Sequence, residues 1–141
     1  MELKNYAVFV HVRPDADAMY PSSYFPWSRF VTGTQGQNPG YDPFAIFVKA
    51  AHNKGLQIHA WVNPYRVTGY HNTWDQVSDQ NPAKKWLTDG DPSNDRWVLK
   101  QNGAYYFNPA IPQVRELIIN GVREIAQKYT VDGIHFDDYF Y

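Results

Sequence analysis

Cysteine is absent from this sequence of 141 residues, which excludes disulfide bonds and thiolate metal sites and leaves the cellular compartment open. Also absent is an apolar run near the roughly 20 residues that a membrane-spanning helix needs. The first residues, Met1 to Asn5, do not have the pattern of a signal peptide. Neither charge dominates, since 13 basic and 14 acidic side chains give a net charge of -1. We therefore expect no membrane span and no general attraction to nucleic acid.

Aromatic residues are abundant, at 17% of the chain, with 11 Tyr, 8 Phe and 5 Trp. Many of them stand beside Pro, Gly, Asn or Asp, outside the periodic apolar segments. Sugar rings present flat C–H faces that stack on Trp and Tyr, so carbohydrate binding is one physical reason for aromatic loops. The alternative is that long loops pack on their own aromatic side chains. Composition alone leaves both interpretations open.

Three segments have the pattern of β-strands, namely Ala7 to Val12, Leu56 to Val62 and Val131 to Asp137. Helical periodicity fills the intervals before the second and third strands. A succession of strand, helix and strand predicts an α/β fold with a parallel sheet and right-handed crossovers.

Two helices are predicted from capping and periodicity. Asp42 is placed to cap the first, Pro43 suits its first turn and Gly55 suits its end. Its apolar stripe comprises Phe44, Phe47, Val48 and Ala51. The second helix begins at Pro112 and continues to about Lys128, with a stripe of Val114, Leu117, Ile118, Val122 and Ile125.

The stretch from Thr68 to Gly103 is polar and predicts a long loop, with a short helix near Trp74 to Val77. Such insertions are uncommon in compact domains unless they are functional or disordered, and their Trp residues argue against disorder. Residues 104–107 form either a small strand or the floor of this loop.

Side chains alternate in character along each predicted strand. One face is apolar: Val8, Val10 and Val12; Ile58, Ala60 and Val62; Ile134 and Phe136. The other carries Phe9, His11 and Arg13; His59, Trp61 and Asn63; His135 and Asp137. Parallel strands covered by helices on both faces usually lack this alternation. A barrel with helices outside and a polar interior toward its carboxyl-terminal mouth explains it, so we expect a site at the strand exits.

The strand exits carry the candidate site residues. They are Arg13, Asp15 and Asp17 at the first exit, Trp61, Asn63, Tyr65 and Arg66 at the second, and His135, Asp137, Asp138 and Tyr139 at the third. Glycosidic bond cleavage needs two carboxyl groups across the scissile bond. Asp137 has inward parity, so we expect it to be the nucleophile or catalytic base.

Simpler roles remain open for several of these residues. Asp138 can cap a helix or form a loop salt bridge, Asp15 and Asp17 can stabilise a turn, and Trp61 can be interior packing. Asp132 lies at the opposite end of its strand and is expected to be structural. His52 and His71 are expected to face solvent. We predict no cofactor and no metal; a site built on His11, His59 and His135 is the alternative.

Several motifs resemble those of a bacterial family of glycoside hydrolase-like proteins, the glycosyl-hydrolase-like family 10. They are Val12-Arg13-Pro14-Asp15-Ala16-Asp17-Ala18, Pro21 to Ser28, Gly33-Thr34-Gln35-Gly36, His59 to Arg66 and Asp132 to Tyr141. The resemblance implies a TIM-barrel glycosidase, usually exported to the cell envelope, that acts on bacterial or dietary glycans. The segment from Asp132 to Asp137 is also similar to the fourth-strand motif of α-amylase-like and α-galactosidase-like barrels, which implies that Asp137 is the nucleophile. His11 stands where the family is expected to have Gln.

Family members extend beyond both ends of this chain, and a full (β/α)₈ barrel takes about 250 residues. The resemblance therefore implies that residues 1–141 form one segment of a TIM barrel, approximately strands two to four with their helices. The general acid is expected outside this chain, and the chain alone is expected to be poorly stable or inactive. Unpaired barrel edges would favour self-association. A non-catalytic carbohydrate-binding partial barrel is the main alternative function, and a metal-dependent hydrolase is another.

Overall fold

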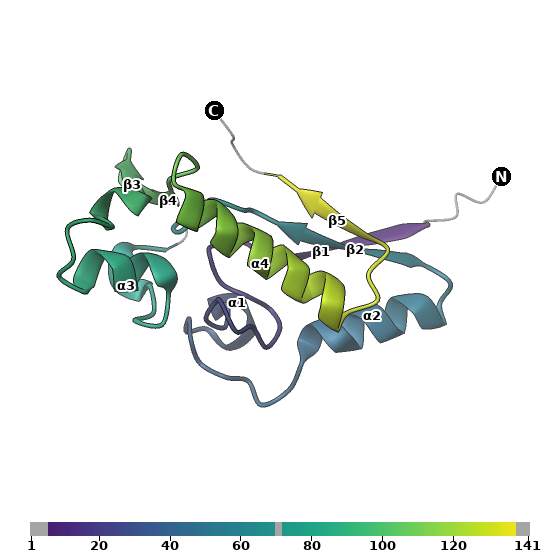
Figure 1. Ribbon diagram of the computed structural model, residues 1–141. Coiled ribbons are helices and arrows are strands. Elements are labelled where there is room, and N and C mark those ends of the chain that lie inside the picture. The colour runs from purple at the N-terminus through teal and green to yellow at the C-terminus, as the bar shows by residue number, and fades with distance from the viewer. Residues whose placement is uncertain (1–5, 70–71, 138–141) are drawn as a thin grey trace.

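The computed structural model describes residues 6–69 and 72–137, and Figure 1 shows a mixed α/β arrangement. In chain order the elements are β1 (Ala7–Arg13), α1 (Arg29–Thr32), α2 (Pro43–Asn53), β2 (Gln57–Val62), the 3₁₀ helix η1 (Trp74–Gln76), α3 (Pro82–Thr88), the 3₁₀ helix η2 (Asp95–Trp97), β3 (Val98–Gln101), β4 (Ala104–Phe107), α4 (Pro112–Lys128) and β5 (Gly133–Phe136). No helix within the described ranges is both long and apolar enough to cross a bilayer.

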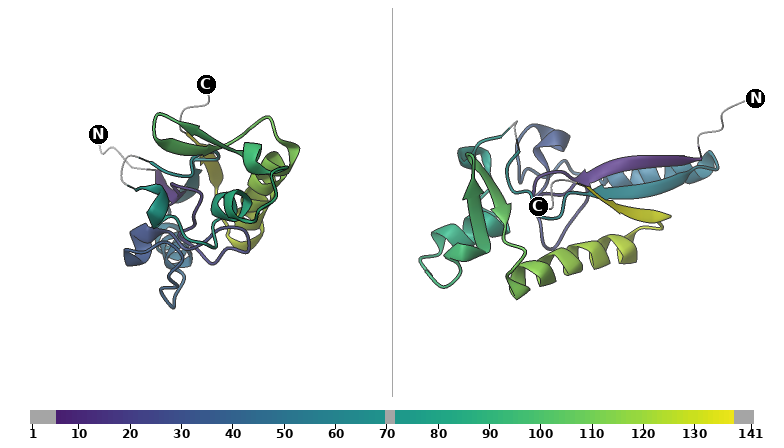
Figure 2. Two further views of the ribbon diagram at one scale, coloured as in Figure 1. Left: turned by 90° about the vertical axis from the view of Figure 1, so that its left-hand side faces the viewer. Right: turned by 90° about the horizontal axis from the view of Figure 1, so that it is seen from above.

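Strands β1, β2 and β5 form one parallel sheet in that order, which confirms the predicted α/β class and the predicted pairing. Their bounds differ from prediction by one or two residues, because Leu56 and Asp132 precede the strands and Asp137 follows. Helices α2 and α4 lie on the same side of this sheet (Figures 1 and 2). The apolar face of the sheet, which includes Ile58, Ala60 and Val62, is on that side and is buried.

Helix α2 forms where capping and periodicity predict it. Asp42 caps it by accepting a hydrogen bond from Ala45 N at 3.0 Å, and Pro43 occupies its first position. Gly55, at φ +68°, ends it, since the left-handed conformation costs glycine little. Three of its predicted stripe residues are buried, but Phe47 is 52% exposed, so the buried stripe is narrower than predicted.

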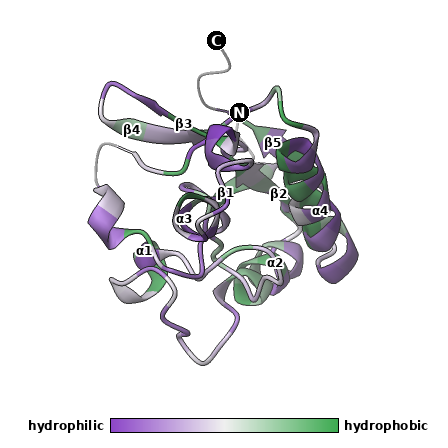
Figure 3. Ribbon diagram, turned by 60° about the vertical axis from the view of Figure 1, so that its left-hand side comes forward, coloured by the Kyte–Doolittle hydropathy of each residue, from purple (hydrophilic) through white to green (hydrophobic). Residues whose placement is uncertain are grey.

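Helix α4 also matches its predicted bounds and packs Val114, Ile118 and Ile125 inward. Figure 3 shows its hydrophobic and hydrophilic residues segregated to different sides. Two further residues of this helix are buried, Gly121 and Glu124, although neither belongs to the apolar stripe.

The prediction of a loop from Thr68 to Gly103 is wrong in part. The short helix near Trp74 is present as η1, but α3, η2 and β3 follow it. Residues 104–107, predicted as either a small strand or the floor of the loop, form strand β4, which pairs antiparallel with β3. Asn102 and Gly103, at φ 51° and 81°, make the two-residue turn, which is the geometry that Asn-Gly favours.

The β3–β4 hairpin and α3 lie beyond the carboxyl ends of the sheet strands (Figures 1 and 2). Backbone hydrogen bonds attach the hairpin to the chain leaving β2: Phe107 N donates to Tyr65 O at 2.7 Å and Val67 N to Tyr105 O at 3.0 Å. Trp86 of α3 packs edge-on to Phe107, with ring centroids 5.6 Å apart. The insertion is therefore an ordered cap at the end of the sheet where the candidate residues lie.

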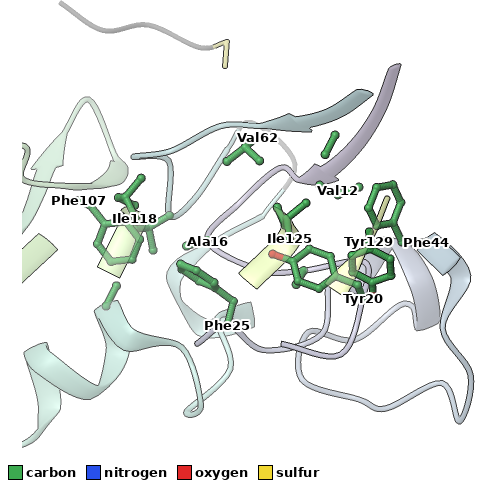
Figure 4. Close-up of a cluster of buried hydrophobic side chains, with 14 of the residues drawn as sticks. Val12, Ala16, Tyr20, Phe25, Phe44, Val62, Phe107, Ile118, Ile125 and Tyr129 are labelled. Carbon is green, nitrogen blue, oxygen red and sulfur yellow. The ribbon is translucent and has the colours of Figure 1, made fainter. Parts of the chain in front are cut away.

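The core runs between the sheet and its two helices (Figure 4). An aromatic cluster at one end joins the β1 exit loop to α2 and α4. In it the ring centroids of Phe44 and Tyr129 lie 4.8 Å apart, and those of Tyr20 and Tyr129 lie 5.7 Å apart. Tyr129 also donates a hydrogen bond to the capping residue Asp42 at 2.6 Å, so one contact network holds both helices.

Candidate functional site

The three strand exits are joined by backbone hydrogen bonds. Asn63 N donates to Arg13 O at 2.9 Å, and Asn63 Nδ2 donates to Pro14 O at 3.2 Å. On the other side, Asp137 N donates to Val62 O at 3.4 Å. The residues that follow β1, β2 and β5 therefore lie next to one another, as parallel pairing predicts.

Asp137 directly follows β5, and its side chain is exposed. His135, two residues earlier, is also exposed and pairs in register with Trp61. The predicted residues Asp138 and Tyr139, like His71, lie outside the described residues.

An array of rings covers the sheet face opposite α2 and α4. His11 stacks on Trp61 with ring centroids 4.0 Å apart and an interplanar angle of 9°. His135 meets Trp61 edge-on at 5.9 Å and Phe9 at 5.4 Å. His59 lies 4.9 Å from Phe9 and directly over Gly133, where a Cβ atom would collide with the imidazole. Phe9 is 53% exposed on this face.

The metal-site alternative was built on three histidines of this face. Among the described residues, no group of three or more His, Cys, Asp or Glu side chains is arranged to hold a metal ion. His11, His59 and His135 instead stack with neighbouring aromatic rings.

The predicted face of Arg13 is wrong. His11 pairs with Trp61 and Arg13 pairs with Val62, so Val12 is an extra residue that forms a β-bulge and reverses the alternation. The side chain of Arg13 therefore points toward α4, where it is fully buried. Its role in substrate binding stays a prediction, and this burial favours a supporting position over direct contact.

The guanidinium of Arg13 lies between Phe25 and the backbone of α4. Its carbon is 3.7 Å from the centre of the Phe25 ring, and a Cβ atom at Gly121 would lie 2.5 Å from Arg13 Nη1. Burial lowers the pKa of Arg13, while the nearby Tyr20, Asp17 and Glu124 counteract this. Within the described part of the chain its nitrogen atoms have no hydrogen-bond partner.

Asp15 and Arg66 approach each other from the first and second exits. A Cβ atom at Gly69 would lie 3.1 Å from Asp15 Oδ1 and 3.7 Å from Arg66 Cδ, so Gly69 leaves room for both side chains. The guanidinium of Arg66 also faces the ring of Tyr106 at 5.6 Å. Asn63 and Arg66 are buried, and Tyr65 is half-buried in the chain that pairs with the hairpin.

Asp17 is fully buried, unlike Asp137. It accepts hydrogen bonds from Asp15 N at 3.2 Å and from Gln35 Nε2 at 3.3 Å. Burial and the negative charge of Asp15 raise its pKa to about 7, although bonds from Ser28, Gln35 and the Asp15 backbone act in the opposite direction. Asp15 and Asp17 thus have different surroundings, since Asp15 lies beside Gly69 and Asp17 is bonded to Gln35.

Sequence reasoning missed three polar residues that support the exits. Gln35 and Asn81 bond to the β1 exit loop, and Glu124 accepts hydrogen bonds from Ser22 Oγ and Ser23 N at 2.6 and 2.7 Å. The available signals were an Asn before Pro82 and an acidic residue within the apolar part of a helix.

The predicted structural role of Asp132 is confirmed at the far end of the sheet. Its Oδ2 accepts a hydrogen bond from Ile58 N at 2.8 Å and lies 2.9 Å from His52 Nε2. The bonds from Ile58 and His52 lower the pKa of Asp132. His52 is exposed, as predicted.

A model of the glycosyl hydrolase-like 10 family matches residues 2–141, which confirms the family resemblance found in the motifs. The chain is 42% identical over 135 residues to the glycosyl hydrolase YngK of Bacillus subtilis, covering 96% of the chain and 25% of YngK. It is 39% identical over 139 residues to the glycosyl hydrolase DigH of Escherichia coli K12, covering 95% of the chain and 30% of DigH. The chain thus spans less than a third of the length of either relative.

Proposed function

The chain belongs to the glycosyl hydrolase-like 10 family, and from this membership we propose that it supplies part of a glycosidase active site in a (β/α)₈ barrel. The arrangement of β1, β2 and β5 supports this proposal, because both long helices lie on one side of the parallel sheet. In such barrels the helices surround the strands and the active site lies at the carboxyl ends.

Asp137 is the proposed nucleophile or catalytic base. The observation that carries this role is its exposed side chain at the exit of β5, next to the β2 exit to which its backbone bonds. A carboxylate there can attack the anomeric carbon, or activate water against it, as the transition state gains oxocarbenium character. The second carboxyl group, the general acid, comes from outside this chain in our proposal.

The proposed substrate is an oligo- or polysaccharide, for example of the bacterial cell wall. Trp61 offers a ring on the sheet face opposite α2 and α4, and sugar hydroxyl groups suit the polar atoms of Asp15, Asn63 and Arg66. Tyr65 and His135 complete the described part of the binding surface, and Asp138 and Tyr139 are its further proposed members. Arg13 and Asp17, both fully buried, would support the surface from behind.

The decisive experiment supplies the missing parts of the site by exchanging this segment for the matching quarter of YngK. Release of reducing sugar from a glycan panel that includes peptidoglycan is then measured. Asp137→Asn in an active chimera should lower kcat by at least about 1,000-fold and leave substrate binding largely intact. Asp91→Asn, which changes an exposed aspartate, is the matched control and should keep full activity. Wild-type turnover in Asp137→Asn would overturn the assignment.

A non-catalytic carbohydrate-binding role is the second candidate. It is favoured by the full burial of Asp17, because hydrolysis needs two carboxyl groups at the scissile bond and Asp17 is enclosed where it cannot supply the second. Saturable glycan binding by the chimera without any release of reducing sugar would support this candidate.

A further inference from the structure

The backbone at Ala16 has an unusual conformation for its residue type. Its φ is 47°, in the left-handed region, and the residue is 1% exposed. This conformation is unfavourable for an alanine, because its Cβ atom crowds the backbone, and it persists only where surrounding contacts impose it. A hydrogen bond from Met19 N to Val12 O, 2.9 Å long, closes the base of the loop that contains Ala16.

Asp17 makes the contacts that impose this turn from one side. Its Oδ1 accepts the backbone N–H of Asp15, across Ala16, and its Oδ2 accepts Gln35 Nε2. Neither carboxylate oxygen of Asp17 is accessible at the protein surface, since the residue is 0% exposed. The carboxyl group of Asp17 therefore closes the turn around Ala16 by bonding to Asp15, and it connects the turn to the loop that contains Gln35.

Asn81 holds the same turn from the other side. Its Nδ2 donates to Ala16 O at 3.1 Å and lies 3.4 Å from Gln35 Oε1, while its Oδ1 accepts Ala83 N and caps α3. Gln35 Oε1 also accepts Ser78 N at 2.9 Å. The turn at Ala16 is thus connected to the insertion that follows β2.

The functional result of the turn is the direction of Asp15. Asp15 Oδ1 lies against Gly69, on the side where Arg66 also approaches, whereas Asp17 points into the protein. We propose that Asp17 is a positioning residue for the glycan site, which holds Ala16 in its left-handed conformation and so fixes Asp15 beside Arg66. This inference rests on the proposed function, because it assigns Asp15 to the sugar-binding surface.

The surroundings of Asp17 make this positioning dependent on pH. Asp15 faces it from its own loop, Arg13 approaches from β1, and Glu124 and Tyr20 lie near that guanidinium. Burial and the charge of Asp15 raise the pKa of Asp17 to about 7. Above this pH a second buried negative charge faces Asp15, so the turn should open more often as pH rises.

The test compares the active YngK chimera described above with its Asp17→Asn and Asp17→Ala variants. Amide hydrogen exchange of residues 15–18, corrected for the intrinsic effect of pH, is measured between pH 5.5 and 8.5, with β2 as an internal reference. Dissociation constants for the glycan panel are measured on the same samples. Asp91→Asn is the control, since it makes the same chemical change at an exposed aspartate.

The chimera without a substitution at Asp17 should lose protection of residues 15–18 by about tenfold across pH 7, with β2 unchanged. Asp17→Asn should remove this pH dependence and keep glycan affinity, whereas Asp17→Ala should lose both loop protection and affinity by about tenfold or more. Unchanged loop protection in Asp17→Ala, or an equal loss in β2, would overturn the proposal. Absence of glycan binding in the chimera without a substitution at Asp17 would instead count against the proposed function, and the exchange data would still decide the positioning role.

Discussion

The guanidinium carbon of Arg13 lies 3.7 Å from the centre of the Phe25 ring, on the side of β1 that α4 covers. Phe25 belongs to the loop after β1, and Glu124 of α4 binds the same loop through Ser22 and Ser23. Arg13 thus packs between Phe25 of this loop and α4, and Glu124 bonds α4 to the same loop at a second position. Stability of the candidate site should therefore depend on residues that never contact a substrate.

Gly121→Ala tests the contact between Arg13 and α4. Alanine would normally stabilise a helix interior, but here its Cβ atom would lie 2.5 Å from Arg13 Nη1 and 2.7 Å from Phe25 Cε2. We expect a loss of about 1 to 3 kcal/mol in the free energy of unfolding, measured by urea denaturation. Glu116→Ala on the exposed side of α4 is the control and should change the free energy of unfolding by less than about 0.5 kcal/mol. A gain in stability from Gly121→Ala would show that the guanidinium is not packed there.

Asp17→Asn tests the effect of the raised pKa on stability. A carboxyl group whose folded pKa is about 7 instead of 3.8 contributes stability that is full below pH 3.8 and is lost as pH rises through 7. The stability of wild type relative to Asp17→Asn should therefore fall between pH 4 and pH 8, by at most roughly 4 kcal/mol. Urea denaturation of both proteins at several pH values measures this. A difference that stays constant across this range would contradict the raised pKa.

Glu124→Gln should show the opposite dependence on pH. Burial acts to raise the pKa of Glu124, but hydrogen bonds from Ser22, Ser23 and Lys128 outweigh it and hold the pKa below its ordinary value of 4.5. The contribution of Glu124 to the free energy of unfolding is then present above pH 4.5 and is lost as pH falls through the lower pKa of the folded state. We expect Glu124→Gln to cost about 1 to 3 kcal/mol at pH 7 and less at pH 3, by urea denaturation. Glu116→Gln serves as the control, and an equal cost at both pH values would argue against the charged bond.

Trp61→Ala tests the ring array as a sugar platform. Loss of the indole removes one stacking surface and the contact with His11, so glycan affinity of the chimera should fall roughly tenfold by calorimetry. Phe30→Ala, at an aromatic residue that is 53% exposed on α1, should leave affinity unchanged. Equal affinities for Trp61→Ala and wild type would move the binding surface elsewhere.

The hairpin and α3 were predictable in principle from local signals that the polar composition obscured. Asn102-Gly103 between two short segments with strand character is a hairpin signal, and Asn81-Pro82 is a helix start. Both elements are short, and their stability depends on contacts such as those of Trp86 with Phe107 and Trp97. Such contacts join distant parts of the chain, and no local pattern encodes them.

Sequence by itself determined α2, α4 and the three sheet strands, because caps, glycine ends and side-chain periodicity act over a few residues. It also determined the family, through motifs that cover most of the chain, and the position of Asp137 at a strand exit. Only the tertiary structure decided which way Arg13 points, since one extra residue at Val12 reverses the alternation without any change in pattern. It likewise decided the different surroundings of Asp15 and Asp17, because Gly69 lies beside Asp15 and Gln35 bonds to Asp17, and both come from other loops.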